Sequence, residues 1–368
     1  MIPRGAGPAP VEPAPAPAPT PVFEPEVLPQ DQQRHRVALL VPLSGRNGGV
    51  GQAIANATTM ALLDTNAANL RITTYDTATR PRDAARRAMA DDNTLVLGPL
   101  LAENIPSVMA ETRAAGVPII SYSNDTKASA AGVYLLGQVP GQSIDRTVEY
   151  ASKKGATRFA ALVPTGDYGN GAEAAFRAAA AKHGGSLVTV ERYARGNTSI
   201  VGAAQRLKTR GGFDSVLIAD GARLSANAAA QLKPGGRGDI QLIGTELWSG
   251  DSAVTRASAM SGSIFSAVSD ERYRQFSESY RTRFGSAPYR ISTLGYDSVL
   301  LALRVASKGW EPGESFPTSE MVDRSGFLGL DGPFRFNLNG IAERSMEIRE
   351  VRRGSVVIVD AAPSRFED

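Results

Sequence analysis

The sequence predicts an α/β protein of two lobes, each built on a doubly wound, mostly parallel sheet, with a cleft between the lobes. Three observations support this prediction. The 368 residues are too many for one small domain and suit two. Short apolar runs alternate with helical stretches at intervals of roughly 20–30 residues, which is typical of βαβ units with right-handed crossovers. This alternation also occurs as two successive sets, one before and one after Pro140.

The first residues form a different kind of segment. Ten of the 23 prolines lie between Pro3 and Pro29, and many of them alternate with alanine. Such a chain lacks backbone donors and bulky apolar side chains, so it favours an extended polyproline conformation over a packed core. We therefore expect residues 1–33 to be a disordered Pro/Ala-rich linker that spans up to roughly 90 Å.

The location of the protein is left open by this N-terminal sequence. Neither a signal peptide nor a lipobox cysteine is visible after Met1. One interpretation is a cytoplasmic protein with a disordered arm. The other, which we favour, is a periplasmic protein tethered to the outer membrane as a lipoprotein, whose export signal lies upstream of the sequence.

The first set of elements begins with the apolar run Val37–Val41, as expected for a parallel strand buried on both faces. A glycine-rich loop follows Pro42 and leads into a helix from Gln52 to about Asn66. We assign residues 34–139 plus 270–330 to lobe 1. Its further strands are predicted over residues 70–75, 95–97 and 117–121, and its further helices over 81–90, 102–115, 271–284 and 292–307.

The second set gives lobe 2, to which we assign residues 140–269 plus 331–368. Two dipeptides typical of hairpin turns, Asn339–Gly340 and Arg353–Gly354, mark a strand-rich tail. The predicted helices are 142–154 and 169–182, and the predicted strands are 158–163, 187–193, 215–219, 240–243, 334–337, 346–351 and 356–359.

Composition excludes most catalytic chemistry. There is no cysteine, and the only histidines are His35 and His183, which removes thiol nucleophiles, most zinc sites and most catalytic triads. No G-x-S-x-G motif occurs, and nothing marks a pair of acid–base carboxylates. We therefore expect no enzyme activity, no catalytic residue, no metal site and no cofactor.

Charge and hydropathy argue against two further kinds of partner. The formal net charge is only +3, and the arginines are scattered without interleaved aromatic residues, so we expect no nucleic-acid partner. No apolar run approaches the ~18 residues that span a bilayer. Membrane contact is therefore expected only through an anchor that this chain does not contain.

Four polar segments follow predicted strands and would border the cleft, because ligands of open α/β sheets bind beyond the strand carboxyl ends. They supply hydroxyl, aromatic and carboxylate groups but no nucleophile–base pair, which is typical of a binding site. The candidate ligand-binding residues are Ser44, Ser121, Ser123, Asp125, Tyr168, Glu246 and Trp248.

Several of these segments carry a family resemblance. The segment Val37–Gly45 with the following Gly51, then Leu97-Gly-Pro-Leu100, Val117–Ser121 and Asp167-Tyr-Gly169, resemble landmarks of type 1 periplasmic-binding proteins of the leucine-binding group. Their order and spacing also match, and the resemblance covers roughly residues 36–360. It implies the two-lobed fold and a small-molecule ligand in the cleft.

Later segments resemble one subgroup, the penicillin-binding protein activators. The resemblance implies an envelope lipoprotein that binds and stimulates a peptidoglycan synthase, that is, a penicillin-binding protein. The matching segments are Gly244–Trp248, Tyr280–Pro288, Leu294-Gly-Tyr-Asp297 and Gly329–Phe336.

The sequence departs from amino-acid receptors of the group at one half of the ligand site. Hydroxyl residues that grip a ligand carboxylate in those receptors are matched here by Ala102 or Glu103 and by Asp125, whereas Glu246 matches the residue that holds the ligand ammonium. A carboxylate facing a carboxylate at ~4 Å is repelled by ~1 kcal/mol in water, and by more in a closed cleft. A non-enzymatic activator of a peptidoglycan synthase is therefore our main hypothesis. The alternative is a periplasmic solute-binding receptor of an ABC importer for amino acids or another small polar ligand.

Overall fold

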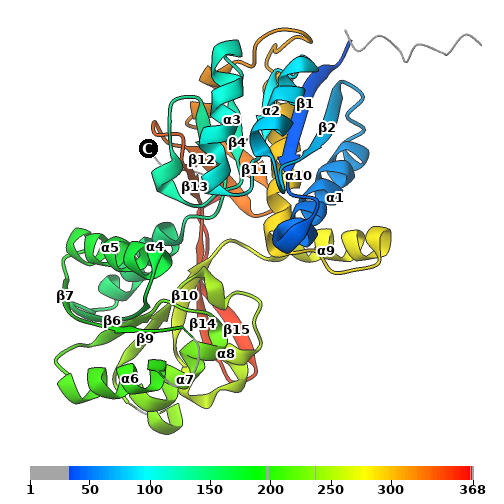
Figure 1. Ribbon diagram of the computed structural model, residues 1–368. Helices are drawn as coiled ribbons and strands as arrows, with labels where there is room; N and C mark the ends of the chain where they lie inside the picture. The colour runs from blue at the N-terminus through cyan, green and yellow to red at the C-terminus, as the bar shows by residue number, and fades with distance from the viewer. Residues whose placement is uncertain (1–32, 196–198, 237, 365, 367–368) are drawn as a thin grey trace, which may run out of the picture.

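The structure is a computed structural model that describes residues 33–364 and residue 366, apart from residues 196–198 and 237. Except for Gln33, the predicted linker lies outside the described residues. The described chain forms two α/β lobes, which confirms the predicted fold class (Figure 1). The chain passes from one lobe to the other at three segments, which we call crossings. Among the described helices, none is long and apolar enough to cross a membrane.

Lobe 1 is centred on a parallel sheet of five strands in the order β2-β1-β3-β4-β5. Neighbouring side chains of β1 enter opposite cores, because successive residues of a strand point to opposite faces. Leu39 packs with residues of α1 and α10, and Leu40 packs with residues of α2 and α3. The strands are β1 His35–Val41, β2 Leu70–Asp76, β3 Leu95–Leu97, β4 Ile119–Ser121 and β5 Val133–Leu135, and the helices are α1 Gly48–Asp64, α2 Pro81–Ala90, α3 Ile105–Thr112, α9 Glu271–Phe284 and α10 Thr293–Ala306.

Lobe 2 has a seven-stranded sheet in the order β15-β14-β10-β9-β8-β6-β7. Strand β14 is antiparallel to both of its neighbours, β10 and β15. Helices α4 and α5 cover one face and α6 and α7 the other. The strands are β6 Arg158–Pro164, β7 Ser186–Tyr193, β8 Ser215–Ile218, β9 Gln241–Gly244, β10 Ile264–Ala267, β14 Glu347–Arg352 and β15 Ser355–Asp360, and the helices are α4 Pro140–Lys153, α5 Asp167–Lys182, α6 Ser199–Arg210, α7 Ala222–Leu232 and α8 Ala253–Arg256.

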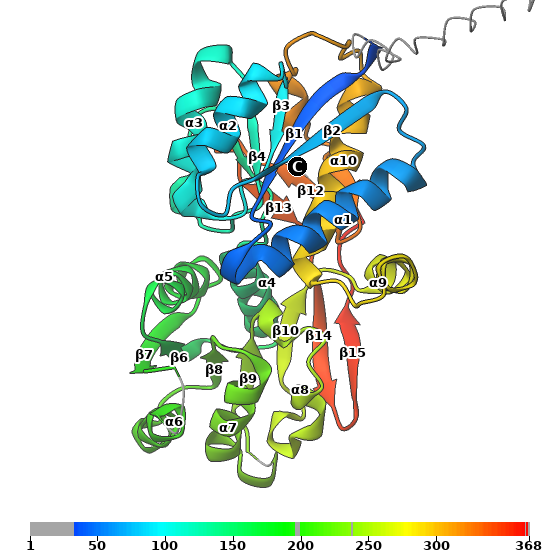
Figure 2. The ribbon, with the colours of Figure 1, turned by 45° about the vertical axis from the view of Figure 1, so that its right-hand side comes forward.

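A small third sheet corrects the predicted boundary of lobe 2. Strands β11 (Phe327–Gly329), β12 (Gly332–Phe336) and β13 (Ala342–Arg344) form an antiparallel sheet. The assignment of all residues from 331 onward to lobe 2 is wrong, because the β12 side chains Phe334 and Phe336 are buried in the core of lobe 1. Only β14 and β15 join lobe 2 (Figure 2).

Other differences from the predicted elements are local. Helix α1 begins at Gly48 rather than Gln52, and the helix predicted over 102–115 is α3 flanked by single 3₁₀ turns. Strands β5 and β10 were not predicted. They have three and four residues, so neither is long enough to show a clear periodicity.

The crossings run over residues 136–139, 268–270 and 345–346, and side chains tie the first to the third. The Gln142 side chain donates to the carbonyl oxygen of Ala342 (2.6 Å) and accepts from the N–H of Arg344 (3.1 Å). The Arg344 guanidinium donates to the carbonyl oxygen of Leu136 (2.8 Å). The lobes are therefore joined by a cross-linked bundle of segments rather than by independent linkers.

The first strand-to-helix connection of each lobe depends on one glycine. A Cβ at Gly51 would lie 1.7 Å from the carbonyl oxygen of Pro42, and a Cβ at Gly169 would lie 1.6 Å from that of Pro164. Each helix can therefore begin close to the strand that precedes it only if this position has no side chain. The same requirement in both lobes positions the polar residues that follow each strand.

We predict that Gly169→Ala destabilises the protein, because the new methyl group would overlap backbone atoms, and such overpacking costs about 1–3 kcal/mol. The matched control is Gly171→Ala in the same helix, where nothing lies within 4 Å of the added Cβ. It should leave the free energy of unfolding unchanged or raise it by up to about 1 kcal/mol. Urea unfolding followed by circular dichroism measures both, and equal stability of the two variants would contradict the prediction.

Candidate functional site

Polar side chains gather at the carboxyl ends of the strands of lobe 2. Tyr168 lies in the first turn of α5, after β6, and Thr245 and Glu246 follow β9. The hydroxyl groups of Tyr168 and Thr245 are 3.4 Å apart. Because the parallel strands β6, β8 and β9 end at the same edge of the sheet, residues distant in sequence converge there.

Glu246 carries a carboxylate oxygen that no described group satisfies. The backbone N–H of Glu246 donates to the Ser143 hydroxyl on α4 (2.9 Å), which fixes the residue against the lobe. Its Oε2 is inaccessible and has no hydrogen-bond partner among the described residues. Burial raises the pKa of Glu246 to about 7, because the negative charge loses its hydration without gaining a cation.

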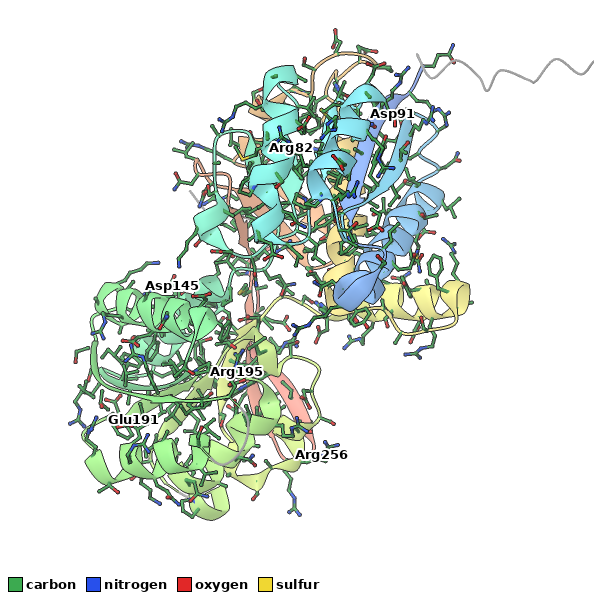
Figure 3. All side chains as sticks on the ribbon, viewed as in Figure 1. Arg82, Asp91, Asp145, Glu191, Arg195 and Arg256 are labelled. Atoms are coloured by element: carbon green, nitrogen blue, oxygen red, sulfur yellow. The ribbon has the colours of Figure 1, made fainter. Side chains whose placement is uncertain are left out.

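A second polar group at the same edge is already satisfied. Asp220, which follows β8, accepts a hydrogen bond from the Tyr193 hydroxyl (2.7 Å) and one from Arg195 Nε (3.2 Å). The Arg195 guanidinium lies over the ring of Tyr168, 5.0 Å from its centre (Arg195 is labelled in Figure 3). Burial, followed by the nearby Glu246 charge, raises the pKa of Tyr168, so this phenol stays neutral.

A cavity of about 600 Å³ lies between the lobes, with Glu246 in its wall. It takes side chains from lobe 2, from the lobe 1 elements around α9, and from two of the crossings, as a ligand site in a two-lobed protein requires. Its lining consists of Gln138, Glu246, Leu247, Ser249, Gly250, Ala267, Val268, Asp270, Tyr273, Arg274 and Arg290.

Asp270, on the second crossing, shows the opposite electrostatic situation to Glu246. Burial alone would raise its pKa, but the guanidinium groups of Arg349 and Arg290 outweigh this effect and hold the pKa below its usual value. Each arginine donates to one carboxylate oxygen at 2.5 Å. Arg290 also pairs with the buried Asp331 (2.8 Å). The Asp270 carboxylate is therefore occupied by ion pairs that join the crossings, whereas the Glu246 carboxylate has no ion pair within the described chain.

A larger hollow of about 1020 Å³ lies entirely in lobe 1 along α3. Glu103 and Asp125 line it, and so do the cations Arg113 and Lys127, so its charges balance. The Asp125 carboxylate is exposed and accepts from the Lys127 N–H (3.0 Å), which caps a short 3₁₀ turn. None of the described residues that line this hollow belongs to lobe 2, so it carries less weight as a ligand site than the cavity between the lobes.

The structure brings together two of the predicted site residues, Tyr168 and Glu246. Ser44 is exposed in the loop before α1 and does not line the cavity between the lobes. Ser123 is buried, and its hydroxyl accepts from the Asp125 N–H (3.1 Å), so it shapes the loop after β4.

The structure does not make Ser121 and Trp248 available to a ligand. Both are fully buried. The Ser121 hydroxyl donates to the carbonyl oxygen of Pro99 (2.8 Å). The Trp248 indole N–H is directed at the carbonyl oxygen of Asp220 (3.1 Å) and the Ser225 hydroxyl (2.9 Å), and its ring packs in the lobe 2 core. A residue that follows a strand can hydrogen-bond to nearby backbone carbonyl groups instead of facing the cleft. The sequence alone does not distinguish these two cases.

The sequence-based list omitted Gln138, Asp270, Tyr273, Arg274 and Arg290. A signal for Asp270 was present, because Val268-Ser-Asp270 follows an apolar run and precedes a helix, as the other polar segments do. Of the remaining residues, Gln138 lies on the first crossing, Tyr273 and Arg274 lie on α9, and Arg290 lies in the 3₁₀ turn before α10. The position of these elements beside the cavity depends on how the lobes pack.

The fold and the cavity together define a two-lobed ligand-binding protein. The family model described as periplasmic binding protein matches residues 35–355, and the chain belongs to this family. Membership implies a periplasmic location and a role in ligand binding. The predicted resemblance to the leucine-binding group is thereby confirmed at this broad level.

Solved structures show the same fold. A Rhodospirillum rubrum protein provisionally assigned to branched-chain amino acid ABC transport is 20% identical, with a TM-score of 0.77 over 89% of this chain and 100% of that chain. A Rhodopseudomonas palustris solute-binding protein in complex with 3,4-dihydroxybenzoic acid is 20% identical, with a TM-score of 0.65 over 91% and 98%. The Streptococcus pneumoniae protein LivJ in complex with isoleucine is 20% identical, with a TM-score of 0.61 over 90% and 100%.

Among curated proteins, an uncharacterized protein of Rickettsia prowazekii, RP748, is 24% identical over 141 residues, which is 38% of this chain and 38% of that protein. The solved structures named above favour the alternative hypothesis, a solute-binding protein, over the penicillin-binding protein activator.

We predict that replacing Glu246 changes the pH dependence of stability. The pKa of about 7 in the folded protein lies above the ordinary value of 4.5, so ionising this group costs stability as pH rises from about 4.5 to 7, and the full cost remains above pH 7. Glutamine does not titrate. The unfolding free energy of Glu246→Gln minus that of the wild type should therefore increase by up to about 3 kcal/mol between pH 4.5 and 8.

Urea unfolding at several pH values measures this difference. The control is Glu103→Gln, which replaces an exposed carboxyl in lobe 1. The unfolding free energy of this variant minus that of the wild type should change little with pH. A stability difference for Glu246→Gln that is independent of pH would show that the carboxyl is hydrated or paired in the folded protein.

Proposed function

We propose that this protein is a non-enzymatic, periplasmic solute-binding protein whose ligand presents a cationic nitrogen to Glu246. One observation carries the proposal: Glu246 belongs to the wall of a cavity formed by both lobes, and its buried Oε2 has no hydrogen-bond partner among the described residues. A buried polar group without a partner is costly, so a ligand that satisfies it is favoured strongly. The family membership and the structural relatives support binding, and the catalytic residue types are scarce in the sequence.

The cavity restricts the ligand in two further ways. A volume of about 600 Å³ suits a small molecule of amino-acid to drug size. Of the two arginines in its wall, Arg290 offers little to a ligand carboxylate, because it is paired with Asp270 and Asp331, whereas Arg274 is exposed on α9. Glu103 and Asp125, which match the hydroxyl positions of the resembling receptors, line the separate hollow of lobe 1 and do not border this cavity. The proposal is therefore a ligand recognised through its ammonium rather than through an α-carboxylate.

We predict that amines bind and that blocking the amine abolishes binding. Leucine, leucinamide and N-acetylleucine form a suitable set of probes, because the first two keep the ammonium and the last two lose a charge at one end only. Leucinamide should bind at least as well as leucine, and N-acetylleucine should not bind. A ligand at 100 times its dissociation constant adds ~2.7 kcal/mol of stability, so a thermal-shift screen with further amino acids and their amides detects binding.

The affinity for leucine should fall about tenfold for each pH unit below pH 7 and be flat from pH 7 to 8.5, because binding requires ionised Glu246 and free leucine keeps its ammonium over this range. Glu246→Gln should remove both the binding and its pH dependence, whereas Glu103→Gln should keep them. Calorimetric titration from pH 5.5 to 8.5 measures this. Binding of N-acetylleucine but not of leucinamide would contradict the proposed ligand chemistry.

A second candidate function is the activation of a peptidoglycan synthase from an outer-membrane tether. Its support is the activator-like segments, such as Gly329–Phe336, and the carboxylates on the lobe 1 side of the site. A screen in which no amine shifts the melting midpoint, together with direct binding of a purified penicillin-binding protein, would favour this candidate over the solute-binding protein.

A further inference from the structure

The last strand of the chain, β15, ends the lobe 2 sheet with an unpaired edge. It is the terminal strand in the order β15-β14-β10-β9-β8-β6-β7, and it pairs only with β14. Figure 2 shows it at the margin of lobe 2, with no element drawn along its outer side. After Asp360 the described chain leads to Ser364, which lines a hollow beside α10 in lobe 1, so this tail does not cover the edge.

The side chains of β15 leave this edge unprotected. Natural proteins usually protect edge strands with charges, prolines or bulges, because an open edge pairs with other chains. The run Ser355-Val-Val-Ile-Val359 contains no charge and no proline, and its one irregularity lies beyond Ile358. Val356 is 37% exposed and Ile358 is 58% exposed.

The opposite edge strand of the same sheet, β7, is protected. It carries Glu191, which pairs with Arg206 and Arg210, and Arg192, which pairs with Glu173. Its exposed apolar residue, Val188, is 46% exposed and therefore comparable with Ile358. The two edges thus differ in charge rather than in exposed apolar residues.

The hairpin register shows which backbone groups point outward. Arg352 pairs with Ser355 across the two-residue turn, Val351 with Val356, Glu350 with Val357 and Arg349 with Ile358. In a two-residue hairpin the closing pair is hydrogen-bonded, and hydrogen-bonded pairs alternate with non-bonded ones. Ser355 and Val357 therefore bond to β14, whereas the N–H and C=O groups of Val356 and Ile358 point away from it.

This edge is complementary to itself. An antiparallel pairing about a two-fold axis at Val357 places Val356 opposite Ile358 of a second copy, with their outward backbone groups hydrogen-bonded to each other. Opposed residues share a face of the sheet, so the two exposed side chains of each copy cover those of the other.

We propose that β15 is a homodimer interface, in which two copies join their lobe 2 sheets edge to edge about Val357. The occupant is a second copy rather than an unrelated peptide because the exposed apolar side chains and the outward backbone groups of Val356 and Ile358 match under the two-fold axis. This interface does not depend on which ligand the cavity takes, so its test is independent of the proposed function.

The first test is the oligomeric state of the full chain. Sedimentation velocity across the micromolar range should show a reversible shift from one chain to two. Ile358→Lys should weaken dimerisation by at least about tenfold. The two lysines of a dimer would lie on the same face of the joined sheet, one on each side of the two-fold axis, and their like charges repel each other. The matched control, Val188→Lys on the other edge of the sheet, should dimerise as the wild type does.

The second test uses the absence of native cysteine. Val357 faces itself across the axis as a non-hydrogen-bonded pair with Cα atoms ~4.5 Å apart, a separation that a disulfide spans. Val357→Cys should therefore form a covalent dimer rapidly on mild oxidation. Val359→Cys, which faces Ser355 of the second copy, should cross-link much more slowly.

The outcomes separate the alternatives. A chain that remains monomeric at every concentration, or Val357→Cys that cross-links no faster than Val188→Cys, overturns the proposal. Dimerisation that survives Ile358→Lys also overturns it, because the contact must then lie elsewhere. If the wild-type dimer is lost when residues 1–32 are removed, the N-terminal segment forms the contact, and the assignment to β15 is wrong.

Discussion

The structure depends on the way that buried and partly buried charges hold its three crossings together. Asp270 on the second crossing is gripped by Arg290 of lobe 1 and by Arg349 of lobe 2, and Arg290 also binds Asp331 beside β12. Arg344 and Gln142 tie the first crossing to the third. Hydrogen-bonded charge pairs lose much more when one partner is removed than they contribute net, so such a network constrains the arrangement of the lobes more than it adds stability. The position of the lobe 1 groups of the cavity relative to its lobe 2 groups follows from it.

The cavity therefore contains two carboxylates in contrasting states. Asp270 has two guanidinium partners, and its pKa is low despite burial. Glu246 has no cation within the described chain, and burial raises its pKa to about 7. The same fold thus uses one carboxylate to join the lobes and leaves the other with unsatisfied charge. A group left in this state destabilises the empty protein and favours whatever cation enters, which is the usual trade between stability and function at a binding site.

The third crossing also determines the outer surface of lobe 2. The chain completes the small sheet on lobe 1 with β13 and then supplies β14 as the antiparallel neighbour of β10. Strand β14 is added beside β10, at the end of the run of parallel strands. The strand that follows it in the hairpin, β15, therefore forms the edge of the sheet. An edge strand rich in valine and isoleucine is a risk in a monomer, since exposed strands pair readily, and it is an advantage only where a specific partner covers it. The architecture of the crossings and the chemistry of β15 are therefore linked.

The sequence by itself determined the α/β class, the two lobes and most strands and helices, because local periodicity and turn residues record them. It also indicated Glu246 and Tyr168, since both follow strands whose carboxyl ends must meet at one edge. Only the tertiary structure decided that Trp248 and Ser121 are core residues, that Phe334 and Phe336 belong to lobe 1, and that Asp270 and Arg290 border the cavity. The physical reason is that a local pattern fixes which face a side chain takes on its own element. Whether that face meets a core, a cleft or another lobe depends on contacts between residues that are far apart in the chain.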